Sequence, residues 1–271
     1  MENENQSTPE KKSNMDYLKD SLKYLGFGDR ANTSLETALK EGKSDIMIPV
    51  SSLYDRPDSK KDDNLTKDYV QYELHFKKGS QSDNYFFNSY NANMVNAQGE
   101  ERYQKFVIDK GKGITAKEAY NLLSGRAVHK NFIKKEGEQY KAFIQYDLKS
   151  PKNEKGNYEI IRFHEKYGYK VNKALEDYPV KFDSPEQKNE IIKSLERGNA
   201  QLVKLENGQK LYAVVNPQGR NIIFLDNQNK NVRVEKVGQV QESGQHQKSS
   251  QTEKTGQAEK KEPSKSKKIK M

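Results

Sequence analysis

Apolar and polar positions along this chain follow a helical period in some segments and alternate in others, and residues 114–164 show both patterns. Thr115 and Glu118 have the spacing of a capping box, in which each side chain pairs with a backbone N–H of the other residue. Apolar positions such as Leu122 then recur at helical spacing, and Gly125 stands where a left-handed C-cap is expected. The pattern predicts a short helix that begins after Thr115 and ends before Gly125.

After this helix the pattern changes to that of strands. Ala127 and Val128, and then residues 140–148 and 158–163, are rich in aromatic and β-branched side chains. Residues 153–157, Asn-Glu-Lys-Gly-Asn, have the composition of a turn. We therefore expect residues 140–163 to form an antiparallel hairpin.

The order of helix, glycine and strands occurs twice more along the chain. Residues 34–42 and 191–198 each have helical spacing and each end on a glycine. Strand-like segments follow both helices, at 46–50, 69–76 and 84–90 after the first and at 201–205, 210–215 and 221–226 after the second. We interpret the three segments as degenerate repeats, each too small to cover both faces of its sheet, so that neighbouring units pack together.

Four shorter segments also have a recognisable pattern. They are an amphipathic helix at 16–25, a charged loop at 55–68, a strand at 106–108 and a helix at 171–178. In addition, Ser184 followed by Pro185 is typical of a helix start, with serine as the cap and proline in the first helical position.

These elements predict an α+β fold of two or three repeated units, each with a short helix, a glycine stop and antiparallel strands, between disordered termini. The units are assigned as a first α+β unit at 16–95, a middle unit at 96–180 and a third at 181–237. The flanking residues, 1–15 and 238–271, are polar and unpatterned, and we expect them to be disordered, the second as a basic tail.

Composition narrows the class of protein. Hydrophobic residues make up 32% of the 271 residues and charged residues another 32%, which favours a modest core with disordered ends. No stretch has the length of apolar sequence that a membrane span needs, and no signal peptide is visible, so we expect a cytoplasmic protein without membrane contact. The absence of cysteine excludes disulfides and thiolate metal sites.

The formal net charge of +9 raises the question of a nucleic-acid partner. Acidic residues are interleaved with most of the basic ones, which is equally typical of an ordinary solvated surface. The segment Lys110-Gly-Lys-Gly113 resembles a phosphate-binding turn before a helix, but it lacks the spacing of a phosphate loop, and a flexible turn explains it as well. The tail segment 265–270 is either solubilising or a contact for phosphate.

We predict that nucleic-acid phosphates contact the basic residues of the middle unit and of the tail: Lys110, Lys112, Arg126, Lys130, Lys134, Lys135, Lys267 and Lys268. Aromatic residues beside these lysines offer a second mode, the stacking of unpaired bases. Their alternation with polar residues favours core packing over stacking.

The sequence shows no pattern typical of an enzyme. No two of the four histidines lie within four residues of each other, so no local metal pair is present, and no nucleophile-elbow sequence occurs. We expect half-buried structural histidines, no cofactor, no metal and no catalytic residues. An enzyme with an unfamiliar site remains a third alternative.

Residues 110–128, KGKGITAKEAYNLLSGRAV, and residues 135–148, KEGEQYKAFIQYDL, resemble a family from conjugative and mobilisable elements of Bacteroidetes, domain of unknown function 3945. The resemblance covers roughly residues 84–236 and includes SLERGNAQLV at 194–203. It implies an accessory protein of a mobile genetic element and supplies no catalytic residues. We therefore predict a non-enzymatic protein that binds DNA or RNA, with a protein-interaction module, an adaptor or inhibitor, as the alternative.

Overall fold

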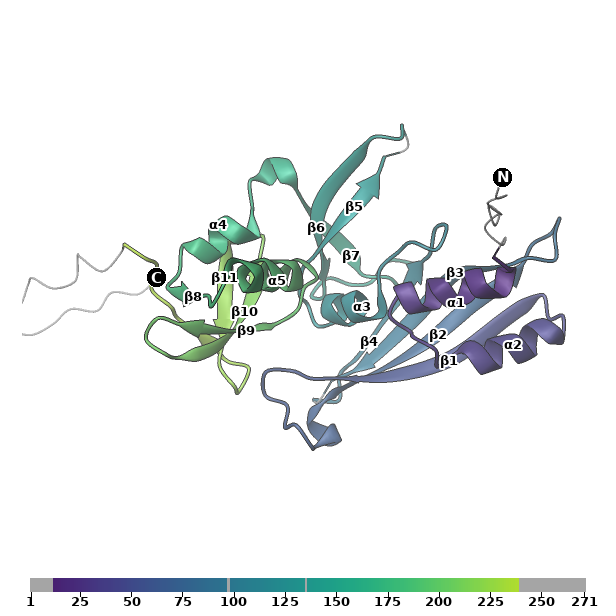
Figure 1. The fold of residues 1–271 in the computed structure, drawn as a ribbon, viewed down its shortest axis with the longest axis horizontal. Coiled ribbons are helices and arrows are strands. Elements are labelled where there is room, and N and C mark those ends of the chain that lie inside the picture. The colour runs from purple at the N-terminus through teal and green to yellow at the C-terminus, as the bar shows by residue number, and fades with distance from the viewer. Residues whose placement is uncertain (1–11, 97, 135, 239–271) are drawn as a thin grey trace, which may run out of the picture. The chain divides into compact units, whose positions relative to one another are not determined.

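The computed structural model describes residues 12–96, 98–134 and 136–238. Within these residues it contains five α-helices and twelve β-strands in three antiparallel sheets, which confirms the α+β class (Figure 1). The predicted disordered tail at 238–271 lies outside the described residues apart from Gly238, and so do residues 1–11 of the predicted N-terminal segment. Helix α1 begins at Asn14, inside the range 1–15 predicted as disordered, because Ser13 and Asp16 form a capping box there.

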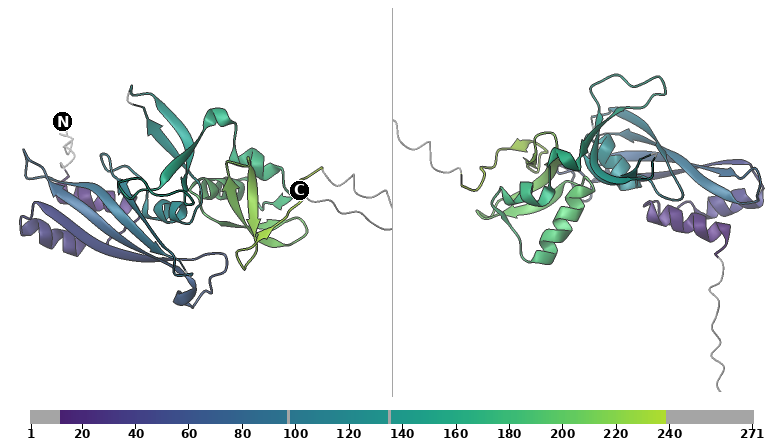
Figure 2. Two further views of the ribbon diagram at one scale, coloured as in Figure 1. Left: turned by 180° about the vertical axis from the view of Figure 1, so that it is seen from behind. Right: turned by 90° about the horizontal axis from the view of Figure 1, so that it is seen from above.

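The first sheet contains β1 (Asp45–Tyr54), β2 (Asp68–Lys78), β3 (Tyr85–Val95) and β4 (Glu101–Val107) in chain order. Figure 2 shows α1 (Asn14–Tyr24) and α2 (Asn32–Lys40) on one side of this sheet. The predicted strands and both helices are confirmed, and each strand is longer than predicted. Strand β4 lies in the range assigned to the middle unit, but it pairs with β3 and completes the first sheet.

The second sheet contains β5 (Val128–Ile133), β6 (Gln139–Asp147) and β7 (Glu159–His164), and it follows α3 (Ala116–Leu123). The capping box of Thr115 and Glu118 is present at the start of α3, as the sequence predicts. Successive residues of β6 point to opposite faces of the sheet, and both faces are buried. Ile144 packs in a core with the first sheet, and Phe143 packs in a core with the third.

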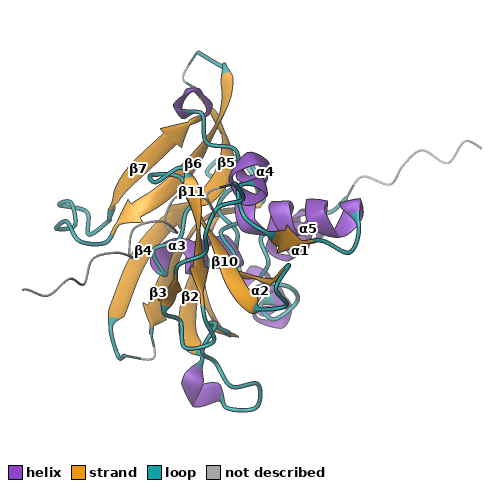
Figure 3. Ribbon diagram, turned by 90° about the vertical axis from the view of Figure 1, so that its left-hand side faces the viewer, coloured by secondary structure: helices purple, strands orange, loops and turns teal. Residues whose placement is uncertain are grey.

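The third sheet has the order β12-β11-β10-β9-β8, from β8 (Val180–Lys181), β9 (Gln201–Leu205), β10 (Lys210–Asn216), β11 (Asn221–Leu225) and β12 (Asn231–Val232). Helices α4 (Val171–Glu176) and α5 (Pro185–Glu196) pack in its core. Figure 3 distinguishes these helices from the strands by colour. Ser184 caps α5 as predicted, whereas β8 and β12 have only two residues each and were not predicted.

The ends of α3 and α5 are in direct contact. Asn121 of α3 is completely buried, and its Nδ2 donates hydrogen bonds to the carbonyl oxygen of Arg197 at 2.7 Å and to Oδ1 of Asn199 at 2.9 Å. Between these two acceptors lies Gly198, whose φ of +81° favours glycine. A Cβ atom at Gly198 would lie 2.8 Å from the carbonyl oxygen of Ala127. This close approach brings the segment after α5 against the segment after α3.

The described residues up to Val237 form a single compact unit, which contains all three sheets. None of the helices in the described ranges is long and apolar enough to cross a membrane.

Candidate anion-binding site

Lys110 and Lys112 lie on one exposed turn between β4 and α3. The turn is closed by two backbone hydrogen bonds, from Asp109 N to Lys112 O at 2.9 Å and from Lys112 N to Asp109 O at 2.8 Å. Lys110 has a φ of +48°, and Gly111 packs towards Tyr17 of α1. The two lysines are therefore brought together, but on a turn that faces solvent rather than on the site described below.

Lys130 and Lys134 are both ion-paired. Lys130 Nζ lies 2.9 Å from an oxygen of Glu118, the residue that also caps α3, and Lys134 Nζ lies 2.6 Å from a carboxylate oxygen of Glu138. Lys130 therefore neutralises a carboxylate that is only 8% exposed. The remaining predicted contacts, Lys135, Lys267 and Lys268, lie outside the described residues.

Among the predicted contacts, Arg126 lines a pocket that the structure forms between distant segments. The pocket has a volume of about 290 Å³ and is built from three segments far apart in the sequence: the loop after β1, the segment from α3 to β5, and the end of α5 with β9 and β10. Its lining residues are Asp55, Arg56, Pro57, Lys117, Asn121, Arg126, Ser194, Asn199, Ala200, Gln201 and Tyr212. No described hydrogen bond, ion pair or ring contact joins this pocket to the Lys110–Lys112 turn.

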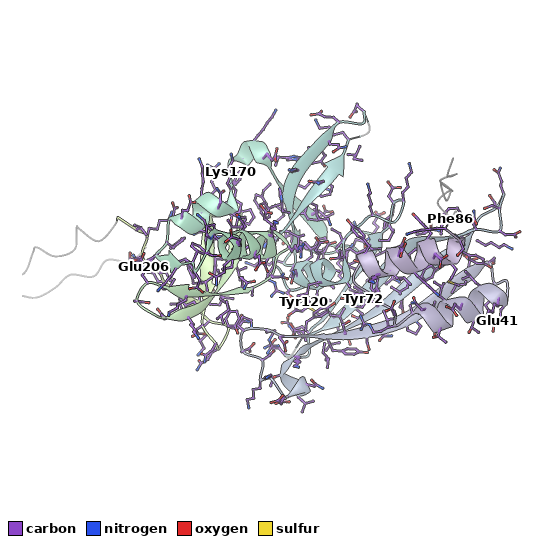
Figure 4. The ribbon with its side chains drawn as sticks, viewed as in Figure 1. Glu41, Tyr72, Phe86, Tyr120, Lys170 and Glu206 are labelled. Atoms are coloured by element: carbon purple, nitrogen blue, oxygen red, sulfur yellow. The ribbon has the colours of Figure 1, made fainter. Side chains whose placement is uncertain are left out.

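Two stacked tyrosine rings support the basic side chains of the pocket. The rings of Tyr54 and Tyr120 lie 4.3 Å apart between centroids with an interplanar angle of 12°. Lys117 Nζ lies 4.5 Å from the first centroid and 4.6 Å from the second, and the guanidinium carbon of Arg126 lies 4.9 Å from the Tyr120 centroid. Figure 4 labels Tyr120 on α3. Both cations thus lie against the ring of Tyr120, and Lys117 also lies against that of Tyr54.

A chain of side-chain hydrogen bonds orients Arg126. Its Nη2 donates to Oδ1 of Asn121 at 2.6 Å, Asn121 donates in turn to Asn199, and Nδ2 of Asn199 donates to Oγ of Ser194 at 3.0 Å. Arg126 Nε is buried and has no hydrogen-bond partner within the described residues. A buried donor without a partner is costly in a folded protein.

The third basic residue of the pocket is already neutralised. Arg56 donates from Nε and Nη2 to the two carboxylate oxygens of Asp58 at 2.8 and 2.9 Å, and from Nη1 to Asp68 at 2.9 Å. Asp55 also lines the pocket and lies 3.5 Å from Lys67 Nζ. Asp68 additionally accepts a hydrogen bond from the Tyr120 hydroxyl, which ties this ion-pair network to the tyrosine stack.

Lys117 and Arg126 therefore differ from the other basic groups of the pocket. Among the described residues, neither is ion-paired with a carboxylate within 4.0 Å. Burial, and next the positive charge of Arg126, lower the pKa of Lys117 to about 8. The Lys117 side chain as a whole remains exposed, which limits the free energy that accompanies this shift. The charges of Asp55 and Asp68 oppose this shift but do not cancel it, so the two cations form a site whose charge an anion would complement.

Sequence analysis identified Arg126 and missed Lys117 and the tyrosine pair. Lys117 occupies an ordinary helical position three residues before Tyr120, and nothing local distinguishes it from a solvated lysine. Tyr54 lies in a strand more than sixty residues earlier in the chain. The site could be recognised only by knowing which sheet packs against α3, and the sequence does not show this.

The described residues contain no group of three or more histidine, aspartate or glutamate side chains arranged to hold a metal ion. His129 is partly buried against Phe143, with 4.7 Å between ring centroids, and burial lowers its pKa. No protein-family model, curated protein or solved structure matches this chain. The resemblance at residues 84–236 therefore stays a prediction.

Proposed function

We propose that this protein binds nucleic acid without catalysing a reaction on it, as an accessory protein of a mobile genetic element. In this proposal Lys117 and Arg126 contact a phosphate of the nucleic acid, and the exposed turn of Lys110 and Lys112 adds long-range attraction. The mobile-element context comes from the family resemblance, and the contact comes from the pocket.

One observation supports the proposal above the others. Lys117 and Arg126 both lie against the ring of Tyr120 without an ion pair to a carboxylate within 4.0 Å among the described residues, although acids are plentiful on this chain. Two neighbouring cations without an ion-pair partner repel each other and lower the stability of the folded state. Proteins retain such destabilising arrangements mainly at functional sites. Phosphate is the anion that basic side chains of nucleic-acid-binding proteins contact most often.

The test is a binding titration of the full chain with labelled single-stranded DNA, double-stranded DNA and RNA across a series of salt concentrations. The observed affinity should fall linearly with the logarithm of salt concentration. Lys117→Ala and Arg126→Ala should each weaken binding about tenfold, the effect of losing one charge-assisted hydrogen bond. Each should also lower the salt slope by about 0.7–0.9.

Lys43→Ala is the matched control. It removes the same charge from an exposed lysine that is already paired with Glu41 and lies outside the predicted contacts, so the loss should be small if the pocket makes the contact. Equal losses for Lys43, Lys117 and Arg126 would show that net charge alone drives binding. No affinity of the wild-type chain for any of the three nucleic acids at low salt would refute the proposal.

A protein partner is the second candidate, and the outer face of the first sheet favours it. Met47, Phe86 and Val107 alternate with buried residues on β1, β3 and β4, and their exposed fractions are 54%, 48% and 72%. A hollow of about 450 Å³ on the same sheet includes Met47 in its lining. Exposed apolar residues that share a face are typical of protein interfaces. A partner retained after nuclease treatment by the wild type, and lost on Phe86→Ser with Val107→Ser, would support this function.

A further inference from the structure

We propose that the pocket of Lys117 and Arg126 binds a phosphate monoester rather than an internal phosphodiester. A monoester is the form that phosphate takes at the end of a nucleic-acid strand and in a free nucleotide. The inference rests on the proposed function, which identifies the anion as phosphate. It adds a statement of which kind of phosphate the site binds.

The first argument concerns charge. A phosphate monoester carries between one and two negative charges at neutral pH, whereas an internal phosphodiester carries one. The pocket presents two cations that form no ion pair within 4.0 Å among the described residues, while its third cation, Arg56, is paired with Asp58 and Asp68. Asp55 and Asp68 favour the charged form of Lys117, but burial and Arg126 disfavour it more. Arg126 disfavours the charged form of Lys117, and a ligand with a second negative charge relieves this repulsion more fully.

The second argument concerns hydrogen-bond donors. Arg126 is held in one orientation by Asn121, so its guanidinium is prepared for a ligand before the ligand arrives. Arg126 lines the pocket, and the Lys117 ammonium offers further donors there. A monoester has three terminal oxygens that can accept hydrogen bonds, while an internal diester has only two.

The third argument concerns access. Three segments line the pocket: the loop at Asp55, the α3–β5 segment at Arg126, and the α5–β10 segment at Asn199. At about 290 Å³ the pocket has the size of a small-molecule site rather than that of a long groove. An internal phosphate enters with a strand on both sides, but a terminal phosphate enters with a strand on one side only.

The pH dependence of binding follows from the groups around Lys117. Those that face it are the cations Arg56 and Arg126, the acids Asp55 and Asp68, and the rings of Tyr54 and Tyr120. Binding of a monoester should weaken above pH 8, where Lys117 loses its proton. It should also weaken below about pH 6, where the monoester loses its second charge. A phosphodiester has no group that titrates near pH 6, so its binding lacks the acid limb.

The experiment measures binding of the full chain to one single-stranded oligonucleotide prepared with a 5′-phosphate, with a 3′-phosphate, or with hydroxyl groups at both ends. A nucleoside monophosphate is the fourth probe. Arg126→Ala tests the pocket, and Lys43→Ala removes an equal charge elsewhere, from an exposed lysine that is paired with Glu41 and does not line the pocket. We expect at least one phosphorylated oligonucleotide to bind about tenfold more tightly than the hydroxyl form, an advantage lost in Arg126→Ala and retained in Lys43→Ala.

Each outcome has a separate meaning. Equal, salt-dependent binding of all three oligonucleotides would overturn the monoester inference and leave the proposed function standing. Binding of the nucleoside monophosphate alone, lost in Arg126→Ala, would support the monoester site and overturn nucleic acid as its source. No binding of any probe would overturn both proposals. If Arg126→Ala does not fold, Arg126→Lys, which keeps the charge but not the fork of donors, takes its place and should lose the same advantage.

Discussion

The substitution Gly198→Ala tests the contact that builds the pocket. Gly198 lies between Arg197 and Asn199, both of which accept hydrogen bonds from Asn121. Its φ of +81° disfavours any residue with a Cβ atom. The added Cβ would also lie 2.8 Å from the Ala127 carbonyl oxygen and 2.9 Å from Cγ2 of Val128. The Ala127 carbonyl belongs to the backbone and cannot move away at little cost. We therefore expect strain at residue 198 and a displacement of the segment after α5 from the segment after α3.

Gly208, in the turn between β9 and β10, separates these two effects. Its φ is +85°, almost the same as at Gly198, but nothing lies within 4 Å of a Cβ added there. Gly208→Ala should therefore cost only the backbone term, about 1–2 kcal/mol. Gly198→Ala should cost the same term and a further ~1–3 kcal/mol for overpacking. The difference between the two variants isolates the contact between the α5 end and the α3 segment.

Urea denaturation of the full chain measures both variants, with the free energy of unfolding obtained by linear extrapolation. We expect Gly198→Ala to be less stable than Gly208→Ala by at least about 1 kcal/mol. Gly198→Ala should also weaken phosphate binding, because Asn121 orients Arg126, whereas Gly208→Ala should leave binding unchanged. Equal stability of the two variants would refute the close packing of these segments.

Two further predictions concern α3. Lys117→Met should stabilise the protein at pH 7 by a few tenths of a kcal/mol, because it removes a charge that burial and the nearby Arg126 both disfavour. Folding lowers the pKa of Lys117 from 10.5 to about 8, so the unfolded chain binds more protons between these two pH values. The destabilisation of the folded state by charged Lys117 is therefore fully present below pH 8 and disappears as the pH rises to 10.5. A thermal melt at pH 7 and at pH 10.5 measures the change, and a gain of the same size at both would contradict it. Glu118→Ala should destabilise by about 1–3 kcal/mol through loss of the cap and of the Lys130 pair, whereas Glu118→Gln keeps an oxygen for Thr115 N and should cost less. Denaturation of both variants should show this order.

Local patterns predicted the elements well where one short segment contains the whole signal. The capping box of Thr115 and Glu118, and the Ser184 cap followed by Pro185, each mark a helix start, and the structure has both. The two-residue strands β8 and β12 are too short for any period to appear in the sequence. They form because a neighbouring strand offers unpaired backbone groups, which is a property of the folded chain.

The site was less accessible to sequence analysis because its residues meet only through tertiary packing. Basic composition drew attention to Lys130, but that side chain pairs with Glu118, twelve residues earlier on another element. Arg126 was identified for its charge, while its orientation depends on Asn121 and on residues more than seventy positions later. Lys117 was missed because helical spacing gives no sign of the Tyr54 ring beneath it.

The most direct test of the account is NMR spectroscopy of arginine Nε–H groups in the full chain during titration with nucleic acid. Arg126 lines the pocket, so a phosphate that binds its guanidinium must change the chemical environment of its Nε–H. The Arg126→Lys variant assigns the signal. We predict that the Arg126 Nε–H resonance shifts as the oligonucleotide saturates the protein, while that of Arg30, whose Nε donates to the carbonyl oxygen of Phe27 and which does not line the pocket, does not. Saturable binding that leaves the Arg126 signal unchanged would place the nucleic acid elsewhere and contradict the account.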